Sequence, residues 1–187
     1  MSTIKLILGC MFSGKTTALI NEYRKWMSIN KNVMCVNSIY DDRYSKDSTL
    51  FSHDNVNIKC LKVKYLDDVS DDVIKKYDVI LINEGQFFDD LVSRCVYWCE
   101  KMNKYIVVFG LDGTFQRKPF GHILDLIPYV DAGNIIKLSA YCSICKDGTP
   151  ASFSVRTTAE KNDIVIGHSD RYIAVCRKHY IEYCNSK

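Results

Sequence analysis

Residues 9–16 read GCMFSGKT and form a complete G-x-x-x-x-G-K-S/T phosphate-binding loop. An apolar run at residues 4–8 precedes this loop, and a segment with helical spacing at residues 17–29 follows it. A strand that leads through such a loop into a helix directs successive backbone N–H groups at one point, where the helix dipole adds positive potential. We therefore expect the chain to fold around a phosphate site at the end of its first strand.

Each position of the loop has an expected role. Lys15 would reach the β- and γ-phosphates of a bound nucleotide, and the Thr16 hydroxyl would sit on Mg²⁺. The residues whose backbone would cradle the phosphates are Gly9, Cys10, Met11, Phe12, Ser13 and Gly14. The flanking strand and helix disfavour a chance match of this pattern in an ordinary turn.

Short apolar segments alternate with helix-like segments along most of the chain. The expected strands are residues 4–8, 32–37, 79–82, 105–110 and 133–141. The expected helices are residues 17–29, 67–76 and 89–103, with a loop over residues 41–54. Continuously apolar strands that alternate with helices predict an α/β fold, in which helices flank both faces of a parallel sheet. Ligands of such sheets bind at the carboxyl ends of the strands, so the phosphate loop, residues 83–84 and residues 110–112 should converge there.

Two short motifs near the end of the chain predict a structural zinc site. Cys142-Ser-Ile-Cys145 and Cys176-Arg-Lys-His179 each have a two-residue gap, so that each pair can hold one tetrahedral ion from a tight turn. Three thiolates and one imidazole leave no open coordination position, which is typical of structural rather than catalytic zinc. Cys184 could compete with His179 as the fourth ligand, although its spacing from Cys176 is less favourable.

The sequence pattern changes near residue 140, where the helix alternation stops and the metal motifs begin. We expect residues 1–140 to form the P-loop ATP-binding domain and residues 141–187 to form a small C-terminal zinc-binding domain. An odd total of nine cysteines argues against a disulfide framework. The cysteines outside the metal motifs that we expect to be buried thiols are Cys10, Cys35, Cys60, Cys95 and Cys99.

Charge and hydropathy argue against two classes of partner. The formal net charge is only +3 and the basic residues are scattered, so we expect no nucleic-acid partner. No apolar run is long enough to cross a bilayer and no signal-peptide pattern is present, so we expect a cytoplasmic protein without a membrane partner. The chain ends soon after the second metal motif, and we expect a compact protein without a long C-terminal tail.

Glu84 follows the apolar strand at residues 79–82, where a P-loop protein normally keeps its second acidic position. A carboxylate at this place can accept a proton from an attacking hydroxyl or water. The sequence NEGQFF at residues 83–88 is polar and then aromatic, which argues against a simple solvated turn. We therefore expect Glu84 to be the catalytic base.

With these motifs in place, the chain strongly resembles the thymidine kinases of the cytosolic and poxviral type. The shared strings are GCMFSGKTT (9–17), DDRY (41–44), HD (53–54), EGQFF (84–88), LDGTFQRKPFG (111–121), both zinc half-sites, and VIG (165–167) ahead of Tyr172. They occur in family order over almost the whole chain, and LDGTFQRKPF is specific to this family. The resemblance implies that the γ-phosphoryl of ATP is transferred to the 5′-hydroxyl of thymidine, giving dTMP and ADP, with catalytic Mg²⁺ and structural Zn²⁺.

The resemblance also implies roles for particular residues. Glu84 matches the general base of the family. Beyond the loop, the residues matching contacts to ATP or its Mg²⁺ are Asp41, Asp42, Arg43, Asn83, Gly85 and Gln86. The residues matching the apolar cage around thymine are Met11, Phe87, Leu111, Phe115, Phe120 and Tyr172. A lasso loop of the zinc domain, which would close over the nucleoside through main-chain hydrogen bonds, matches Asp163, Ile164, Val165, Ile166 and Gly167. Family members are commonly homotetramers inhibited by dTTP, and both properties are expected here.

Three positions depart from the family pattern. Asn83 replaces the aspartate that normally holds Mg²⁺, and an amide brings no charge. Either magnesium binding is weaker, or Asp41 or Asp112 compensates. His179 stands where mammalian relatives have cysteine, and zinc accepts either ligand. Cys10 replaces the common proline of the loop, and we expect it to make the enzyme sensitive to thiol reagents.

Two other functions fit parts of the pattern. A nucleotide kinase would need further arginines to clamp a substrate phosphate, and only Arg117 and Arg171 are near the expected site. A zinc-containing P-loop ATPase acting on nucleic acid would need a basic stripe with interleaved aromatic residues, which the sequence lacks. A purely structural zinc protein would leave Glu84 and the phosphate loop unexplained.

Overall fold

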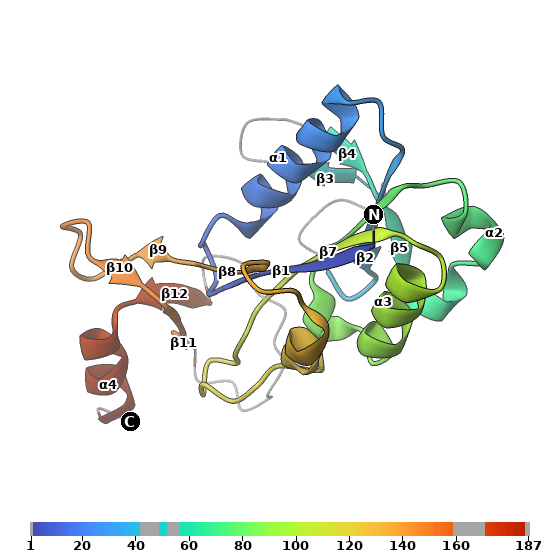
Figure 1. Ribbon diagram of the computed structural model, residues 1–187. Coiled ribbons are helices and arrows are strands. Elements are labelled where there is room, and N and C mark those ends of the chain that lie inside the picture. Colours follow the sequence, from blue (N-terminus) through green and yellow to red (C-terminus); the bar gives the residue numbers. More distant parts are fainter. Residues whose placement is uncertain (1, 42–48, 52–56, 159–170, 186–187) are drawn as a thin grey trace.

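The computed structural model describes residues 2–41, 49–51, 57–158 and 171–185. Within these residues, six parallel strands form the main sheet in the order β5-β2-β6-β7-β1-β8 (Figure 1). Their bounds are β1 Thr3–Gly9, β2 Val33–Ser38, β5 Leu61–Val63, β6 Val79–Ile82, β7 Tyr105–Gly110 and β8 Ile135–Leu138. The predicted parallel sheet is confirmed.

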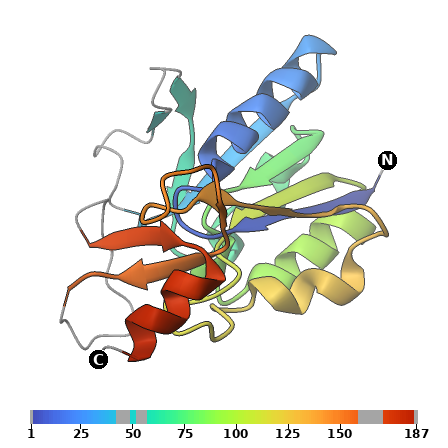
Figure 2. The same cartoon turned by 90° about the vertical axis from the view of Figure 1, so that its left-hand side faces the viewer.

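Helices cover both faces of this sheet, as Figures 1 and 2 show. They are α1 (Lys15–Ser28) on one face, and α3 (Leu91–Glu100) with the 3-10 segment η3 (Ile123–Tyr129) on the other. In β6, Ile80 and Ile82 pack on the α3 side, whereas Val79 and Leu81 pack on the α1 side. Successive side chains of a strand point to opposite faces. A strand covered on both faces is therefore apolar at every position, which explains the run VILI.

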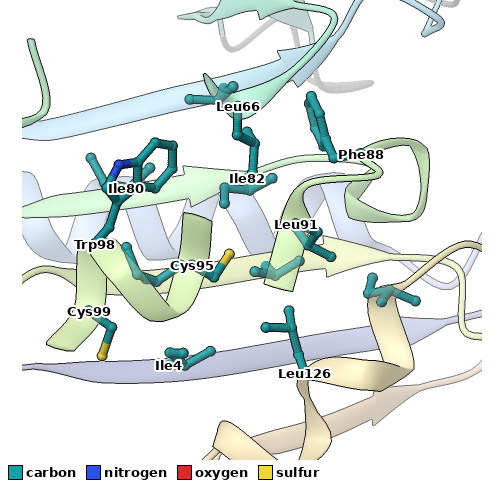
Figure 3. Close-up of a cluster of buried hydrophobic side chains, with 14 of the residues drawn as sticks. Ile4, Leu66, Ile80, Ile82, Phe88, Leu91, Cys95, Trp98, Cys99 and Leu126 are labelled. Carbon is teal, nitrogen blue, oxygen red and sulfur yellow. The ribbon is translucent and has the colours of Figure 1, made fainter. Parts of the chain in front are cut away.

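The larger apolar cluster fills the layer between the sheet and α3 (Figure 3). Trp98 and Cys95 of α3 point toward Ile80 and Ile82 of β6, and Trp98 is fully buried. Burying one large apolar side chain contributes about 1.5–3 kcal/mol relative to leaving it exposed. The five cysteines expected to be buried thiols outside the metal motifs are all buried.

Two predicted elements are each divided in the structure. Residues 67–76 do not form one helix; they form η1 (Leu66–Asp68) and α2 (Asp71–Ile74). Val69 and Ser70 between these pieces adopt extended backbone angles, and Val69 is buried, so the interruption is held by core packing. Residues 133–141 contribute to two different sheets, because β8 pairs with β1 whereas β9 (Ala140–Tyr141) pairs with β10 (Pro150–Ala151).

Several short strands of the structure are absent from the sequence-based prediction. Part of the expected loop at residues 41–54 is strand β3 (Thr49–Phe51), which pairs antiparallel with β4 (Asn57–Lys59). The edge strand β5 was likewise not predicted. Each of these strands has only three residues, which is too short to display the alternation that identifies a strand.

A second group of short strands follows the main sheet and lies at one end of the molecule (Figures 1 and 2). We call residues 140–158 and 171–185 the C-terminal lobe. Within it, β11 (Phe153–Arg156) pairs antiparallel with β12 (Tyr172–Val175), and α4 (Arg177–Asn185) contacts both strands. The buried residues of the lobe form a cluster of their own, and Cys10 of the phosphate loop belongs to that cluster.

Among the described residues, none of the helices combines the length and apolar character needed to span a bilayer.

Candidate active site

The loop between β1 and α1 brings a cation to the start of a helix. Gly14 has φ 81° and Phe12 has φ 65°, so the chain enters the left-handed region twice before α1 begins at Lys15. The Lys15 ammonium donates hydrogen bonds to the carbonyls of Gly9 at 3.1 Å and Cys10 at 2.7 Å. The positive end of the helix dipole and the Lys15 charge are therefore together at the carboxyl end of β1, an arrangement suited to phosphate groups.

The remaining loop positions differ in exposure. Phe12 is exposed, Thr16 lies half-buried in the first turn of α1, and Ser13 is buried. The Ser13 hydroxyl has no hydrogen-bond partner among the residues that the structure describes. A Cβ on Gly9 would lie 2.5 Å from that hydroxyl and 2.8 Å from the Leu138 carbonyl oxygen, so glycine at this position leaves room for the backbone of β8.

The phosphate loop is also attached to the C-terminal lobe. The Met11 N–H donates to the Ser154 hydroxyl at 2.9 Å, and the Cys10 thiol donates to the Ala151 carbonyl at 3.3 Å. Burial raises the pKa of the Cys10 thiol, although the backbone and Lys15 oppose this effect. The nucleophilic form of cysteine is the thiolate. A buried thiol with a raised pKa therefore argues against the expected sensitivity of Cys10 to thiol reagents.

Glu84 lies directly after β6 in an unusual backbone conformation. Its φ of 52° and ψ of 46° are left-handed, and only 4% of the residue is exposed. Such a conformation costs a non-glycine residue about 1–3 kcal/mol and persists only where the surrounding structure holds it. The Gln86 amide donates to the Glu84 carboxylate at 2.6 Å and accepts the Leu111 N–H at 3.0 Å. Gln86 thus ties Glu84 to the segment that follows β7.

Two glycines leave room for Gln86. A Cβ on Gly110 would collide with the Gln86 side-chain oxygen, and a Cβ on Gly121 would collide with the Gln86 carbonyl. Gly121 also has φ 54°, which glycine adopts without strain. Steric crowding therefore explains why the string LDGTFQRKPFG ends in glycine: the backbone of the Glu84–Phe87 turn lies too close to Gly121 for a side chain.

A buried series of hydrogen bonds connects Asn83 to Asp41. The Asn83 amide donates to the Asn37 side-chain oxygen at 3.2 Å, and the Asn37 amide donates to the Asp41 carboxylate at 3.1 Å. All three residues are at most 2% exposed. Of the two carboxylates considered as compensation for Asn83, Asp41 is therefore linked to it. Asp112 is paired with the Lys137 ammonium at 2.5 Å instead.

A cavity of about 560 Å³ opens beside Gln86, and three residues of the predicted thymine cage line it: Phe87, Phe115 and Phe120. The Phe87 and Phe120 rings meet edge to face with 5.5 Å between their centroids, a favourable arrangement for aromatic pairs. The cavity volume falls in the range of small-molecule sites. Polar side chains complete the wall, among them Tyr40, Thr114, Gln116 and Lys118.

The other three predicted cage residues do not line this cavity in the described part of the chain. The Leu111 N–H donates a hydrogen bond to the side chain of Gln86, which does line the cavity. The Tyr172 hydroxyl accepts a hydrogen bond from Arg156, which contacts the Phe115 ring of the cavity wall. The Met11 backbone N–H donates to the Ser154 hydroxyl of the C-terminal lobe.

Arg156 is a buried cation that the sequence reasoning missed. Its guanidinium carbon lies 4.0 Å from the centroid of the Phe115 ring, and two of its nitrogens donate to the Tyr172 hydroxyl at 3.1 and 3.0 Å. Arg156 is only 2% exposed, and cation–π contacts are strongest where water is excluded. The Tyr180 hydroxyl also donates to the Phe115 carbonyl at 2.8 Å. The C-terminal lobe therefore holds one wall of the cavity in place.

The four predicted metal ligands lie together. Their ligand atoms are all within 4.8 Å of one another, with Cys145 and Cys176 sulfurs 3.9 Å apart and His179 Nδ1 3.3–3.4 Å from each sulfur. Ideal tetrahedral zinc with Zn–S bonds near 2.3 Å requires sulfurs about 3.8 Å apart. The donor set and spacing therefore fit zinc. Cys184 is exposed and does not belong to the cluster.

The surroundings of this cluster affect its thiols differently. Burial opposes ionisation of Cys142, but hydrogen bonds from the N–H groups of Cys145, Cys176 and Ile144 outweigh it and lower the pKa of that thiol to about 6. Burial and the neighbouring Cys142 sulfur raise the pKa of Cys145 to about 11.

Some predicted residues lie outside the described part of the chain. They are Asp42 and Arg43 of the DDRY string, and Asp163, Ile164, Val165, Ile166 and Gly167 of the predicted lasso.

The chain is an α/β protein whose first strand leads through the loop GCMFSGKT into α1, and its attached lobe carries a Cys3His cluster that could hold a metal ion. The family model described as "Thymidine kinase" matches residues 2–180 of the chain. The chain belongs to the thymidine kinase family, and it is a nucleoside kinase by that membership.

Named relatives come from viruses and plants. A Variola virus thymidine kinase is 43% identical over 182 residues, covering 96% of this chain and 97% of the relative. Thymidine kinase a of Arabidopsis thaliana is 38% identical over 182 residues, covering 95% and 74%. A rice thymidine kinase is 39% identical over 184 residues, covering 96% of this chain, which spans 66% of the rice protein's length.

Proposed function

We propose that this protein transfers the γ-phosphoryl of ATP to the 5′-hydroxyl of thymidine, giving dTMP and ADP. The observation that carries the proposal is the cavity of phenylalanine side chains beside Gln86, which itself hydrogen-bonds to Glu84. A flat aromatic base would pack against the phenylalanine rings, and the 5′-hydroxyl of its sugar would then approach the carboxylate. The phosphate loop lies at the same edge of the sheet.

In this proposal Glu84 accepts the proton of the 5′-hydroxyl as the phosphoryl group is transferred. Gln86 holds the carboxylate by donating to one of its oxygens. Lys15 and the N–H groups at the start of α1 stabilise the negative charge on the phosphates. The oxygen atoms available to Mg²⁺ or its water ligands belong to Thr16, Asn83 and Asp41, and such hard oxygen donors suit this ion. Bound Mg²⁺ would supply positive charge that offsets the negative charge of the phosphates.

A nucleoside fits the site better than a nucleotide. Binding a substrate phosphate takes clamping cations, usually arginines. Arg117 is directed at the C-terminal lobe, with its guanidinium 4.4 Å from the Tyr180 ring centroid. Among the described residues that line the cavity, Lys118 is the single lysine or arginine.

Offering thymidine and thymidylate separately as acceptors tests this choice. We expect [γ-³²P]ATP to label thymidine at least about 100-fold more efficiently, measured as kcat/KM, because the described cavity wall offers Lys118 but no arginine to clamp a substrate phosphate. Preferential labelling of thymidylate would identify a nucleotide kinase instead.

Arg156 provides a separate prediction. Replacing Arg156 with Met removes the contact to the Phe115 ring and leaves the Tyr172 hydroxyl without these donors, at a cost of about 1–3 kcal/mol. We expect the KM for thymidine to rise about 10-fold while the KM for ATP stays within about twofold. Arg24→Met, on the exposed side of α1, should match the parent protein. Equal changes in both KM values would show a general loss of structure.

The second candidate, a zinc-containing ATPase acting on nucleic acid, has less support, because the chain belongs to a nucleoside kinase family. ATP hydrolysis that rises with added single-stranded DNA would favour it.

Several further properties belong to the same proposal. Zn²⁺ would occupy the Cys142, Cys145, Cys176 and His179 cluster as a structural ion, supported by its donor geometry. A cytoplasmic location is supported by nine free cysteines, which a reducing compartment preserves.

We also propose that the protein forms a homotetramer and that dTTP inhibits it. The exposed Ile135 and Ile136 on the edge strand β8 offer a surface for another copy.

A further inference from the structure

Three neighbours bond to the Asn37 amide, and two of them, the Ser38 N–H and the Asp41 carboxylate, fix its orientation because the first only donates and the second only accepts. Its side-chain oxygen accepts from the Asn83 amide at 3.2 Å and from the Ser38 N–H at 2.9 Å, while its nitrogen donates to the Asp41 carboxylate at 3.1 Å. Turning the amide over would place its nitrogen against the Ser38 N–H and its oxygen against the Asp41 carboxylate. Because these four residues are at most 2% exposed, water cannot repair such mismatches.

The orientation of Asn37 in turn fixes that of Asn83. Since Asn37 presents an oxygen, Asn83 must donate through its nitrogen, and its own oxygen lies on the other side of the amide. Asn83 directly precedes Glu84 at the carboxyl end of β6. An amide oxygen can ligate a hard cation or accept a hydrogen bond from a water molecule bound to it.

A carboxylate at position 83 would conflict with this arrangement. It would present an oxygen to the Asn37 oxygen, and if Asn37 turned over, the Asn37 oxygen would face the Asp41 carboxylate instead. In either case two acceptors face each other without a proton between them. Asn37 and Asn83 are therefore a matched pair, in which one amide requires the other.

We propose that Asn37 is a positioning residue: it selects an amide at position 83 and commits the Asn83 oxygen to magnesium or its water ligands. The magnesium half of this statement rests on the proposed function, whereas the pairing half does not. No local motif around Asn37 reveals its role, because its partner is 46 residues away in the sequence.

A cycle of four proteins followed by thermal unfolding tests the pairing. Asn83→Asp is expected to lower Tm by about 5 °C, because it buries two facing acceptors. Asn37→Lys supplies a side chain that only donates, which suits a carboxylate on each side but opposes the Asn83 nitrogen. The combined variant N37K/N83D should therefore recover at least about half of the loss, whereas N37K alone is destabilised. Asn21→Asp, on the exposed side of α1, is the matched control and should keep the parental Tm.

Additive effects of the two substitutions, or an unchanged Tm for Asn83→Asp, would overturn the pairing. If Asn83→Asp fails to fold, a folded N37K/N83D protein supports the pairing. An unfolded double variant beside a folded N37K protein contradicts it.

The magnesium half is tested with Asn37→Leu, which keeps a similar volume and removes the polar contacts. We expect the Mg²⁺ concentration for half-maximal phosphorylation to rise about 10-fold, with the KM for thymidine unchanged, as for the loss of a residue that orients a metal ligand. A lower kcat at unchanged Mg²⁺ dependence would overturn this half. Absence of kinase activity in the parent protein would refute the proposed function, and the Tm cycle would still decide the pairing.

Discussion

Glu84→Gln is expected to lower the kcat for thymidine phosphorylation about 10³-fold, within the range that a positioned general base contributes. Glutamine has nearly the same shape as glutamate, and its side-chain oxygen can still accept the hydrogen bond from Gln86. The fold and the cavity should therefore persist, while the group that takes the 5′-hydroxyl proton is lost. The measurement is the steady-state rate of ADP formation at saturating thymidine and MgATP.

The control for this variant is Glu100→Gln, at the exposed end of α3 and away from the carboxyl edge of the sheet. It should keep the parental kcat, and both variants should keep the parental Tm. A parental rate in Glu84→Gln would show that another group takes the proton.

Cys142→Ser is expected to abolish binding of the proposed zinc ion and to loosen the C-terminal lobe. A structural zinc ion in a small domain contributes on the order of 10 kcal/mol or more to folding, because the site forms only in the folded state. Serine is a poor zinc ligand and cannot replace the Cys142 thiolate, which accepts hydrogen bonds from the N–H groups of Cys145, Cys176 and Ile144. The zinc content, measured by elemental analysis, should fall from one ion per chain to near zero.

Loss of zinc should also disturb the conformation of the phosphate loop, since Met11 is hydrogen-bonded to Ser154 and Cys10 packs in the core of the lobe. We expect weaker ATP binding in Cys142→Ser, as well as a lower Tm. Cys184→Ser is the matched control, because Cys184 is exposed and outside the cluster, and it should retain a full complement of zinc. An unchanged metal content in Cys142→Ser would rule out this ligand set.

Structural elements could be predicted from the sequence wherever a local pattern has a single physical explanation. The run VILI at residues 79–82 is apolar at every position because helices cover both faces of the sheet. The two cysteine motifs meet because each is a tight turn with the spacing of a tetrahedral half-site. The phosphate loop was equally local, since strand, loop and helix are contiguous in the chain.

Prediction failed where distant residues decide the outcome. The expected helix at residues 67–76 is interrupted because the core buries Val69 in an extended conformation. The roles of Arg156 and Asn37 depend on partners in other segments, Phe115 and Asn83 respectively, and neither residue lies in a recognisable motif. The burial of Cys10 was expected, but its position in the core of the C-terminal lobe also depends on residues far away in the sequence.

The most direct test of the proposed function is to identify the products of a single incubation of the protein with ATP, Mg²⁺ and thymidine. Separation and mass measurement should show ADP and thymidine 5′-monophosphate formed in equal amounts, with neither formed when thymidine is left out. ADP formation without a phosphorylated nucleoside, or formation that depends on added DNA rather than on thymidine, would contradict the assignment of this site to thymidine phosphorylation.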